Sequence, residues 1–561
     1  MPPWLWRLRR PRRQGRDRPI DQDDVRTHGY PAQIPISDYR AYPRLEVRDF
    51  LLARKPVDVR VGLAPHYDPT LSITGEIHFP AIEPALVLEA EVLFDPRSFT
   101  VDGPTTISLK VSAEEPFPSQ VVRLTPQTDP HLTAERTLRV LYRHHGNIIG
   151  IASRTIEVVG SVNEIVGRNQ RGRPAHQLLD LAPLLHSGPP DLVLVVFRAD
   201  EPDTYVWDAY PFAGHVSLSD GNRRSRIDSG AKDFASFTRR AIRARKLSGI
   251  PVYDQLVGYG DVIHEAIPAG VRTILRDLVA DRSQAPTMLL LTEEAFVPWE
   301  LAVFDPPLRT EFGGAAPFLG AHIAVSRWPF TAADTPSPIN RQVHHVARQA
   351  VVTADYEGVL NWKPLPAATA EADRFRQLHG PVVTIEASRE KLIECLDGRE
   401  PVDLLHVAMH GAYDSSAEED GLVFPLPDFS PSYLTSLQVR GFRNRTTTPF
   451  VYLNACEVGA GDATLGSYAG FAVAVLRTGA IGVIAPLWNV DDHAAAELAG
   501  QFYAGAYGRP PVPVAELLRR MRSGYTRAAV AEREAITPTA IAFVAFCHPR
   551  LTLLRTPTPE S

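Results

Sequence analysis

The sequence contains little cysteine for its length: three cysteines in 561 residues, namely Cys395, Cys456 and Cys547. A small, odd number of cysteines excludes a disulfide framework and suits a reducing compartment. No uninterrupted apolar run approaches the roughly 20 residues of a transmembrane helix. The first residues are rich in arginine from Arg7 to Arg18 but lack the apolar stretch of a secretory signal. We therefore expect a cytoplasmic protein without a membrane span.

Net charge is also small. A formal net charge of −6 on a chain of this length gives no whole-protein argument for direct binding of nucleic acid or of a membrane surface. An apolar fraction of 44% with 22% charged residues is ordinary for a soluble globular protein. The length suggests about three or four domains. Proline is abundant, with 50 residues in short clusters, which indicates many loops and linkers.

The basic residues at the start are interrupted by Pro11, Gly15 and Pro19. We expect residues 1–42 to form a solvated, disordered tail. The alternative is an electrostatic tether to an acidic partner.

Residues 43–160 have the pattern of an all-β sandwich. Apolar and polar residues alternate through Leu86–Phe94 and again through Ile107–Val111, as half-buried strands require. A turn is predicted at His145–Asn147, and short strands with Pro and Gly between them are typical of a sandwich. We expect this domain to act in recognition or as a scaffold. A linker is predicted over 161–184, with its most polar part at Asn169–Pro174.

The remainder predicts an α/β region. Leu192–Phe197 and Met288–Leu291 are continuous apolar runs, which suit strands buried on both faces of a parallel sheet. From about Val346 onwards strands and helices alternate, which indicates one mostly parallel sheet. Strands are predicted at 382–385, 402–408, 450–453, 481–487 and 542–546, and helical segments at 234–246, 263–278, 367–378, 468–477 and 494–504. Ser388 is expected to cap a further helix.

Two of these strands end on groups that can perform chemistry. One is followed by His410 and Gly411, and the other by Cys456. Functional groups in open α/β sheets collect at the carboxyl ends of strands, so a thiol and an imidazole on neighbouring strands would be within reach. A thiol with a pKa of about 8.5 is mostly protonated near neutrality, and an imidazole can take its proton. An inert core cysteine and a structural histidine are the alternative interpretation.

Three longer stretches strengthen the first interpretation. DLLHVAMHGAYDSSAEEDGLVF, FVYLNACEVGAG and GSYAGFAVAVLRTGAIGVIAPLWNVDDHAAAEL resemble the CHAT-domain proteases of the caspase–separase clan. PWELAVF, LPAATAEADRF and AFVAFCHPRL are similar to other parts of that family and occur in the same order, so that the resemblance covers about 191–554. It implies a caspase-like α/β domain of three layers, with a non-catalytic half at 185–340 and a catalytic half at 341–556, followed by a tail at 557–561.

The resemblance also implies roles for single residues. His410 would be the general base and Cys456 the nucleophile of a cysteine endopeptidase. The backbone N–H groups of Gly411 and Cys456 would form the oxyanion hole. Asp492 would line the S1 pocket and favour a basic P1 residue, for which Arg is suited, with Asp491 as its neighbouring competitor. Alternatively, both carboxylates simply begin the following helix, where they complement the helix dipole.

The family implies hydrolysis of a protein substrate through a thioester acyl-enzyme, without a cofactor or a metal. It further implies regulation in bacterial defence or programmed cell death, and we expect an activating protein partner to bind the β-sandwich. Many CHAT proteins carry helical repeats where this chain has a β-rich domain. Two rivals stay open: a catalytically silent caspase-like scaffold that binds protein partners, and a non-protease binding module.

Several other residues have two interpretations. His406 precedes His410 by four residues, but on a strand it is expected to be structural and not a metal ligand. The acidic loop of Asp414, Glu418, Glu419 and Asp420 is expected to be solvated, with attraction of a basic substrate or a Ca²⁺ site as alternatives.

Arg443 or Arg445 would be a point of self-cleavage in an Arg-specific enzyme. Glu300 is expected either to support the site or to join the two α/β halves. The 461–467 segment mimics part of a phosphate-binding loop but lacks its lysine. Cys395 and Cys547 are expected in the core.

Overall fold

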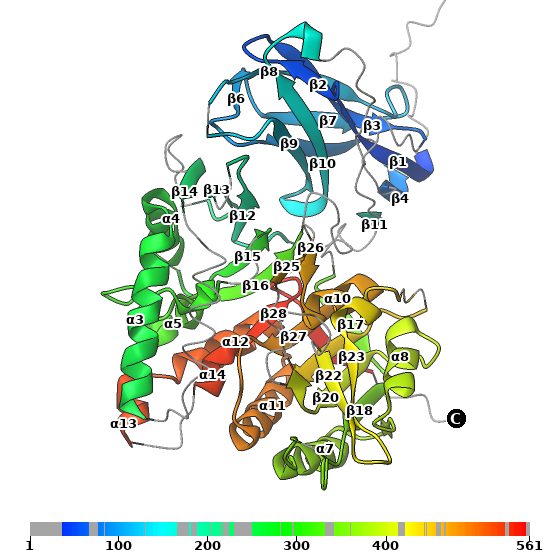
Figure 1. The fold of residues 1–561 in the computed structure, drawn as a ribbon, viewed down its shortest axis with the longest axis vertical. Helices are drawn as coiled ribbons and strands as arrows, with labels where there is room; N and C mark the ends of the chain where they lie inside the picture. The colour runs from blue at the N-terminus through cyan, green and yellow to red at the C-terminus, as the bar shows by residue number, and fades with distance from the viewer. Residues whose placement is uncertain are drawn as a thin grey trace, which may run out of the picture.

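The structure is a computed structural model. It describes residues 36–556 except 67–76, 83–84, 130, 165–178, 181–187, 202–203, 215, 217–223, 229–248, 281, 294–296, 331–340, 360, 413–420, 443, 445, 456–461, 465–466 and 533–537. Two β-sheets form the upper part in Figure 1, and the α/β elements lie below them. The linker predicted at Asn169–Pro174 and the helix predicted at 234–246 lie outside the described residues.

The first part of the chain folds into two sheets that share one hydrophobic core. Their orders are β11-β4-β1-β3-β8-β6 and β2-β10-β9-β5-β7. The strands are β1 (Ile36–Glu46), β2 (Phe50–Leu52), β3 (Val57–Ala64), β4 (Ile77–Ile82), β5 (Leu86–Leu93), β6 (Phe99–Asp102), β7 (Thr106–Val111), β8 (Ser119–Pro126), β9 (Glu135–His144), β10 (Asn147–Val159) and β11 (Leu179–Asp180).

The strand pattern read from the sequence explains this packing. In β5, Leu86, Leu88 and Ala90 are buried while Val87 is 47% exposed, because alternate side chains point to opposite faces. The turn between β9 and β10 consists of His145 and Gly146, both with positive φ of 47° and 76°. Two such residues match the twist of a hairpin, and glycine accepts this conformation readily.

The α/β region contains two large sheets, which are called the second and the third sheet because the β-sandwich comes first in the chain. The second sheet has the order β14-β13-β12-β15-β16. Its strands are β12 (Leu192–Arg198), β13 (Thr204–Pro211), β14 (Arg224–Asp228), β15 (Thr287–Thr292) and β16 (Ala324–Pro329). β12, β15 and β16 run parallel, which the continuous apolar runs predicted for β12 and β15. The helical elements here are α3 (Ile250–Ala266), α4 (Ala269–Val279), η3 (Trp299–Leu301), α5 (Thr310–Gly313) and α6 (Leu319–His322).

The third sheet has the order β19-β18-β20-β24-β27-β28 and is parallel except for β28. Its strands are β18 (Gln349–Thr353), β19 (Val382–Thr384), β20 (Leu404–Ala408), β24 (Phe450–Asn454), β27 (Gly482–Pro486) and β28 (Phe543–Phe546). A small sheet beside it contains β21 (Gly411–Ala412), β22 (Gly421–Pro425) and β23 (Pro431–Thr435). β17 (Val343–Val346) pairs with β29 (Thr552–Arg555), and β25 (Asp462–Thr464) with β26 (Ser467–Ala469).

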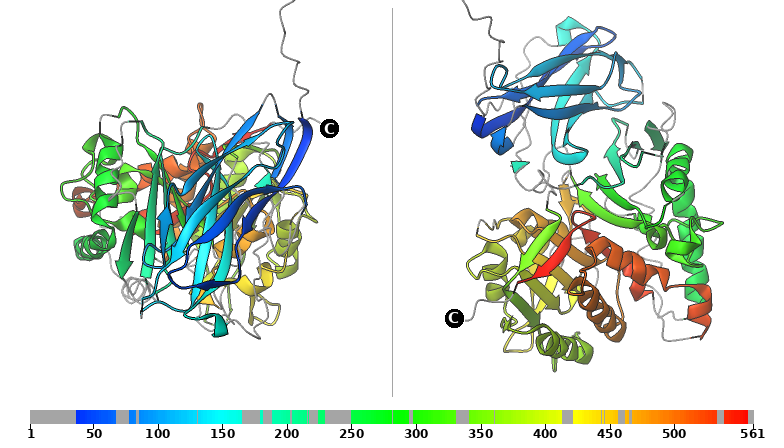
Figure 2. Two further views of the ribbon diagram at one scale, coloured as in Figure 1. Left: turned by 90° about the horizontal axis from the view of Figure 1, so that it is seen from above. Right: turned by 180° about the vertical axis from the view of Figure 1, so that it is seen from behind.

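Helices cover both faces of the third sheet and give three layers. One face packs against α7 (Pro366–His379), α11 (Asp492–Ala506) and α12 (Val514–Ser523). The other packs against α8 (Arg389–Asp397), α9 (Ser436–Val439) and α10 (Phe471–Thr478). The short helices α13 (Arg527–Glu532) and α14 (Thr539–Ala542) precede β28. The view from behind in Figure 2 shows these layers around the sheet.

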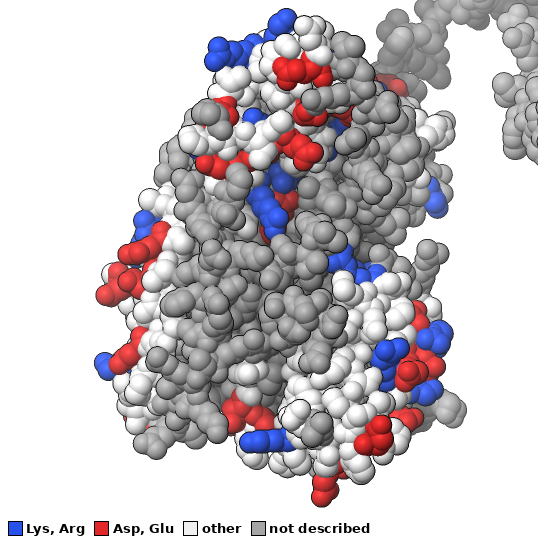
Figure 3. Space-filling model, viewed as in Figure 1, with Lys and Arg blue, Asp and Glu red and all other residues white. Residues whose placement is uncertain are grey.

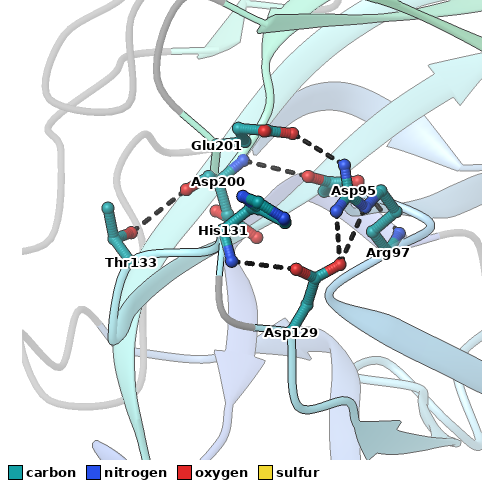
Figure 4. Close-up of polar contacts among 7 residues, drawn as sticks. All are labelled: Asp95, Arg97, Asp129, His131, Thr133, Asp200 and Glu201. Atoms are coloured by element: carbon teal, nitrogen blue, oxygen red, sulfur yellow. Dashed lines mark hydrogen bonds and ion pairs between the residues drawn. The ribbon is translucent and has the colours of Figure 1, made fainter.

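The β-sandwich joins the second sheet through a polar interface. The guanidinium of Arg139 in β9 lies against Glu293 with an Nη2–Oε2 distance of 2.8 Å, and both side chains are almost fully buried. Figure 4 shows a second group of contacts, in which Arg97 of the sandwich reaches Glu201 at 2.8 Å and also pairs with Asp129. The backbone N–H of Asp200 donates to Asp95 at 3.1 Å. These contacts hold the sandwich against the α/β region.

Four sequence-based boundaries differ from the structure. The predicted linker 161–184 contains β11, which pairs with β4 of the sandwich. β1 begins at Ile36 and not after residue 42, because its backbone pairs with β3 and β4. The segment 263–278 contains parts of two helices, since α3 ends before Ile267 and α4 begins after Pro268. Tyr468 lies in β26 and α10 begins only at Phe471. On the face in Figure 3, the described acidic and basic side chains are interspersed, in keeping with the small net charge.

Candidate functional site

His410 lies two residues beyond the carboxyl end of β20, an inner strand of the third sheet. Its Nε2 is 2.7 Å from the backbone carbonyl oxygen of Lys363. A carbonyl can only accept a hydrogen bond, so Nε2 carries a proton in this contact and the lone pair of the neutral ring resides on Nδ1. The rings of Tyr356 and Trp362 flank the imidazole, with centroid distances of 4.5 Å and 4.8 Å.

The surroundings of His410 favour the neutral imidazole. Partial burial lowers the pKa of His410, since the charged form loses hydration. The hydrogen bond to Lys363 and the charge of Asp492 act in the opposite direction, and burial prevails. A neutral imidazole near pH 7 is the form that a general base requires.

The backbone of His410 is held by one tyrosine hydroxyl. The N–H of His410 donates to Tyr356 Oη at 3.0 Å, and that hydroxyl donates to the carbonyl of Val423 at 2.7 Å. The carbonyl of His410 in turn accepts from the N–H of Val423 at 3.0 Å. Tyr356 is fully buried, so this small ring of hydrogen bonds is shielded from water.

The two strands that the sequence singled out are neighbours in the sheet. β20 and β24 are parallel, and their register pairs Ala408 with Asn454. The N–H of Met409 continues this pairing by donating to the carbonyl of Asn454 at 3.2 Å. Gly411 is buried at the start of β21 and pairs with Leu422. Cys456 lies outside the described residues, and Ala455 is the last one before it.

The two aspartates predicted near the substrate pocket both lie at the start of α11. Asp491 is exposed and caps the helix, since its Oδ1 accepts from the N–H of Ala494 at 2.9 Å. Asp492 is half-buried, and its Oδ2 accepts from the N–H of Ala367 in the first turn of α7 at 2.9 Å. The helix-start interpretation therefore describes Asp491 well, while Asp492 links two helices and acts electrostatically on His410.

A buried polar network beneath the sheet end was not expected from the sequence. His406 is fully buried in β20, with Nε2 2.8 Å from Oε1 of Glu371 and Nδ1 2.9 Å from the hydroxyl of Tyr503. The second oxygen of Glu371 accepts from Nδ2 of Asn454 at 2.8 Å. His406 is thus structural, as expected. Its position four residues before His410 was the only sequence signal, and it did not reveal Glu371.

Glu300 lies in another buried charged cluster. Oε1 of Glu300 accepts from Nε of Arg327 at 2.8 Å, and the second oxygen pairs with the same guanidinium. Arg522 of α12 is also fully buried and interacts electrostatically with Glu300. η3 follows β15 of the second sheet, β16 is a strand of that sheet, and α12 covers the third sheet. Glu300 therefore joins the two α/β halves, which was one of its two expected roles.

The other residues that the sequence singled out divide in two groups. Cys395 and Cys547 are buried free thiols in the core. The acidic loop with Asp414, Glu418, Glu419 and Asp420 lies outside the described residues, and so do Arg443 and Arg445. Within the described residues, no group of three or more His, Cys, Asp or Glu side chains is arranged to hold a metal ion.

A comparison with protein families gives one match. The family model described as the CHAT domain matches residues 285–537. The chain therefore contains a CHAT domain. The match begins just before β15 and extends beyond α13, so the CHAT domain contains Glu300, His410, Cys456 and Asp492. It includes part of the second sheet and the greater part of the third.

Solved structures resemble this CHAT protein only distantly. Two structures of the Saccharomyces cerevisiae separase–securin complex match with 8% and 12% identity, TM-scores of 0.36 and 0.32, and coverage of 64% and 58% of this chain. This chain spans only 30% and 22% of those chains. A structure titled "Structure of Protease" matches with 10% identity and a TM-score of 0.32, over 54% of this chain and 75% of that one. The comparison with curated proteins found no match.

The remaining structural finding concerns membranes. No helix in the part of this CHAT protein that the structure describes is long and apolar enough to cross a membrane.

Proposed function

We propose that this CHAT-domain protein is a cysteine endopeptidase, with His410 as the general base and Cys456 as the nucleophile. The observation that carries the proposal is the contact between Nε2 of His410 and the carbonyl oxygen of Lys363 at 2.7 Å. It fixes the tautomer in which Nδ1 is free to accept a proton.

The register of the sheet supports the pairing of these two residues. Ala408 and Asn454 are opposite each other in parallel strands, and His410 and Cys456 each follow by two positions. In parallel sheets, groups beyond the carboxyl ends of neighbouring strands meet at the same edge. The CHAT-domain proteases that the sequence resembles have the same order of His-Gly and Ala-Cys.

The proposed reaction has two halves. Nδ1 of His410 takes the proton of the Cys456 thiol, and the thiolate attacks the peptide carbonyl carbon. The N–H groups of Gly411 and Cys456 stabilise the oxyanion. When the C–N bond breaks, the imidazolium gives its proton to the leaving amine, and a thioester remains. His410 then deprotonates a water molecule that hydrolyses the thioester, which releases the acid and restores the thiol. No cofactor takes part.

For the substrate, we propose a protein cleaved after a basic residue, preferably arginine. Asp492 is the residue that would contact the P1 side chain, because its charge already acts on His410. One of its oxygens accepts from the N–H of Ala367, which leaves Oδ1 for a guanidinium. Asp491 is the weaker candidate, since it is engaged as the cap of α11.

We further propose that the enzyme is regulated by a protein partner that binds the β-sandwich, in bacterial defence or programmed cell death. The buried contact between Arg139 and Glu293 supports this link, because it connects the sandwich firmly to the α/β region. A cytoplasmic location is part of the same proposal. The rival, a catalytically silent scaffold, would use the same surfaces without cleavage.

The test uses thiol-reactive peptide probes with arginine, aspartate or leucine at P1 on the full chain. We expect labelling of Cys456 by the arginine probe and its loss in His410→Ala. Cys395→Ala is the control, because burial raises the pKa of the Cys395 thiol to about 12 and makes it unreactive. Labelling of Cys456 that persists in His410→Ala refutes the dyad, and absence of labelling by all three probes supports the scaffold.

The P1 preference has its own test. Asp492→Asn keeps an oxygen that can accept from Ala367 but removes the charge. We expect it to abolish the preference for the arginine probe over the leucine probe. Asp491→Asn is the matched control and should retain the preference. A preference that survives in Asp492→Asn and disappears in Asp491→Asn would assign the pocket to Asp491.

A further inference from the structure

A groove of about 520 Å³ lies at the edge of the third sheet. Its apolar surface comes from Val359, Phe424 and the turn between β22 and β23, where Leu426 and Phe429 are 43% and 58% exposed. The Phe429 ring packs over Gly358, where a Cβ atom would approach it to 3.1 Å, so the two walls of the groove are in contact.

The rim of this groove is acidic. Asp355, Glu357, Glu386 and Glu390 line it, all of them exposed, and Arg389 is the only basic residue in the lining. A second depression in the described part of the chain, at the carboxyl ends of α7 and α11, is lined by Arg509 and Arg555 without any acidic side chain. This second depression therefore lacks the acidic rim of the first groove.

The walls of the groove adjoin two residues that hold the backbone of His410. Tyr356, which holds the backbone of His410, lies between the lining residues Asp355 and Glu357. On the other wall, Phe424 follows Val423, which exchanges a hydrogen bond with the carbonyl of His410. A segment bound in the groove would thus rest on the same loop and strand that orient the imidazole.

This chain carries a segment with complementary chemistry. Residues 4–13 read Trp-Leu-Trp-Arg-Leu-Arg-Arg-Pro-Arg-Arg, with apolar residues that suit the floor and arginines that suit the rim. Between this segment and β1 lie residues 14–35, which extend to at most about 73 Å. A compact chain of this length has a radius of gyration of about 24 Å. The extended linker is about three times this radius, so it is long enough for the segment to fold back onto the body of the molecule.

We propose that residues 4–13 dock in this groove within the same molecule. Trp4, Leu5 and Trp6 contact the floor around Phe429, and the arginines pair with Glu357, Glu386 and Glu390. Because the segment is tethered, its effective concentration is in the millimolar range, and even weak docking is well populated. The proposal goes beyond the proposed peptidase activity and does not depend on it.

Photo-crosslinking tests the docking. Trp6 is replaced in the full chain by a photoreactive benzoyl-phenylalanine, with Cys456→Ala present to prevent any self-cleavage. After irradiation, the cross-linked positions are mapped by mass spectrometry. We expect intramolecular cross-links to the segments 355–359 and 424–429. The yield should fall severalfold in 1 M salt, because the Debye length shrinks to about 3 Å.

A pair of charge-reversed variants supplies the control. Glu357→Lys with Glu386→Lys should lower the cross-link yield at least fivefold. Glu114→Lys with Glu115→Lys makes the same charge change at exposed residues of the β-sandwich and should leave the yield unchanged. The proposal is overturned if the cross-links map elsewhere, if both double variants behave alike, or if mixed isotope-labelled chains are linked only to each other.

Discussion

The buried charge cluster around Glu300 predicts a large effect of one small substitution. Glu300 and Arg327 are 2% and 0% exposed, and Arg522 is 1% exposed. Burial would raise the pKa of Glu300, but the charge and hydrogen bonds of Arg327, helped by Arg522, hold it below its usual range. Burial lowers the pKa of Arg522 to about 10, against the charge of Glu300. The carboxylate is thus the shared counter-charge of two guanidinium groups.

Glu300→Gln keeps the shape of this side chain and removes its charge. Breaking a buried ion pair by removal of one partner costs about 3–5 kcal/mol, because the other charge stays buried without compensation. A free energy of 1 kcal/mol shifts the melting temperature of a domain of 150–250 residues by about 2–4 °C. We therefore expect the α/β region of Glu300→Gln to melt on the order of 10 °C below the wild type, measured by calorimetry on the full chain.

The pH dependence gives a second readout of the same cluster. The folded-state pKa of Glu300 is depressed, so its stabilisation is complete above the unfolded pKa of about 4.5 and is lost as the pH falls through the folded pKa. Glu300→Gln should accordingly weaken the decline of melting temperature below about pH 5. The control is Glu394→Gln, which removes a half-buried partner of the exposed Lys391 and should lower the melting temperature far less. If both variants melt within 2 °C of the wild type, the reasoning about the cluster is refuted.

Three further predictions concern the site and the domain interface. Tyr356→Phe removes a buried hydroxyl that joins His410 to Val423, and chemical denaturation should show a loss of about 1–3 kcal/mol together with slower probe labelling. The rate of Cys456 labelling should decline only below about pH 6.5, because burial lowers the pKa of His410. Asp492→Asn should move this decline to still lower pH, because the charge of Asp492 raises the pKa of His410. A decline that begins above pH 7 would contradict the assignment. Glu293→Gln removes the carboxylate that pairs with the buried guanidinium of Arg139 at the sandwich interface and should make the chain more sensitive to limited proteolysis. Arg123→Gln, which removes an exposed ion pair, should not.

Much of the sheet was predictable because buried parallel strands leave a clear pattern. The apolar runs at Leu192–Phe197 and Met288–Leu291 became β12 and β15, and the strands before His410 and Cys456 became neighbours β20 and β24. Hydrophobic periodicity reports directly on burial, so the elements with two buried faces were the easiest to recognise. Boundaries were harder, as at Pro268, where the helical pattern continues across a break between α3 and α4.

The partners of His410 could not be predicted in the same way. The contact of its Nε2 is a backbone carbonyl, which every residue possesses, and Lys363 lies 47 positions earlier in the chain. The loop that carries this carbonyl also carries Tyr356 and Trp362, whose aromatic rings would suit any core. Tertiary contacts of this kind have no local signature, so only the three-dimensional fold assigns the tautomer of the imidazole.

The network under the sheet shows how such contacts reach beyond the site itself. A buried histidine and a buried asparagine on adjacent strands would each be costly without partners. One carboxylate of α7 contacts both of them, since Glu371 lies 2.8 Å from Nε2 of His406 and accepts from Nδ2 of Asn454 at 2.8 Å. α7 begins three residues after Lys363, and Asp492 accepts from its first turn. The same helix therefore supports the strand ends from below and anchors the loop that orients His410, so a shift of α7 would change both together.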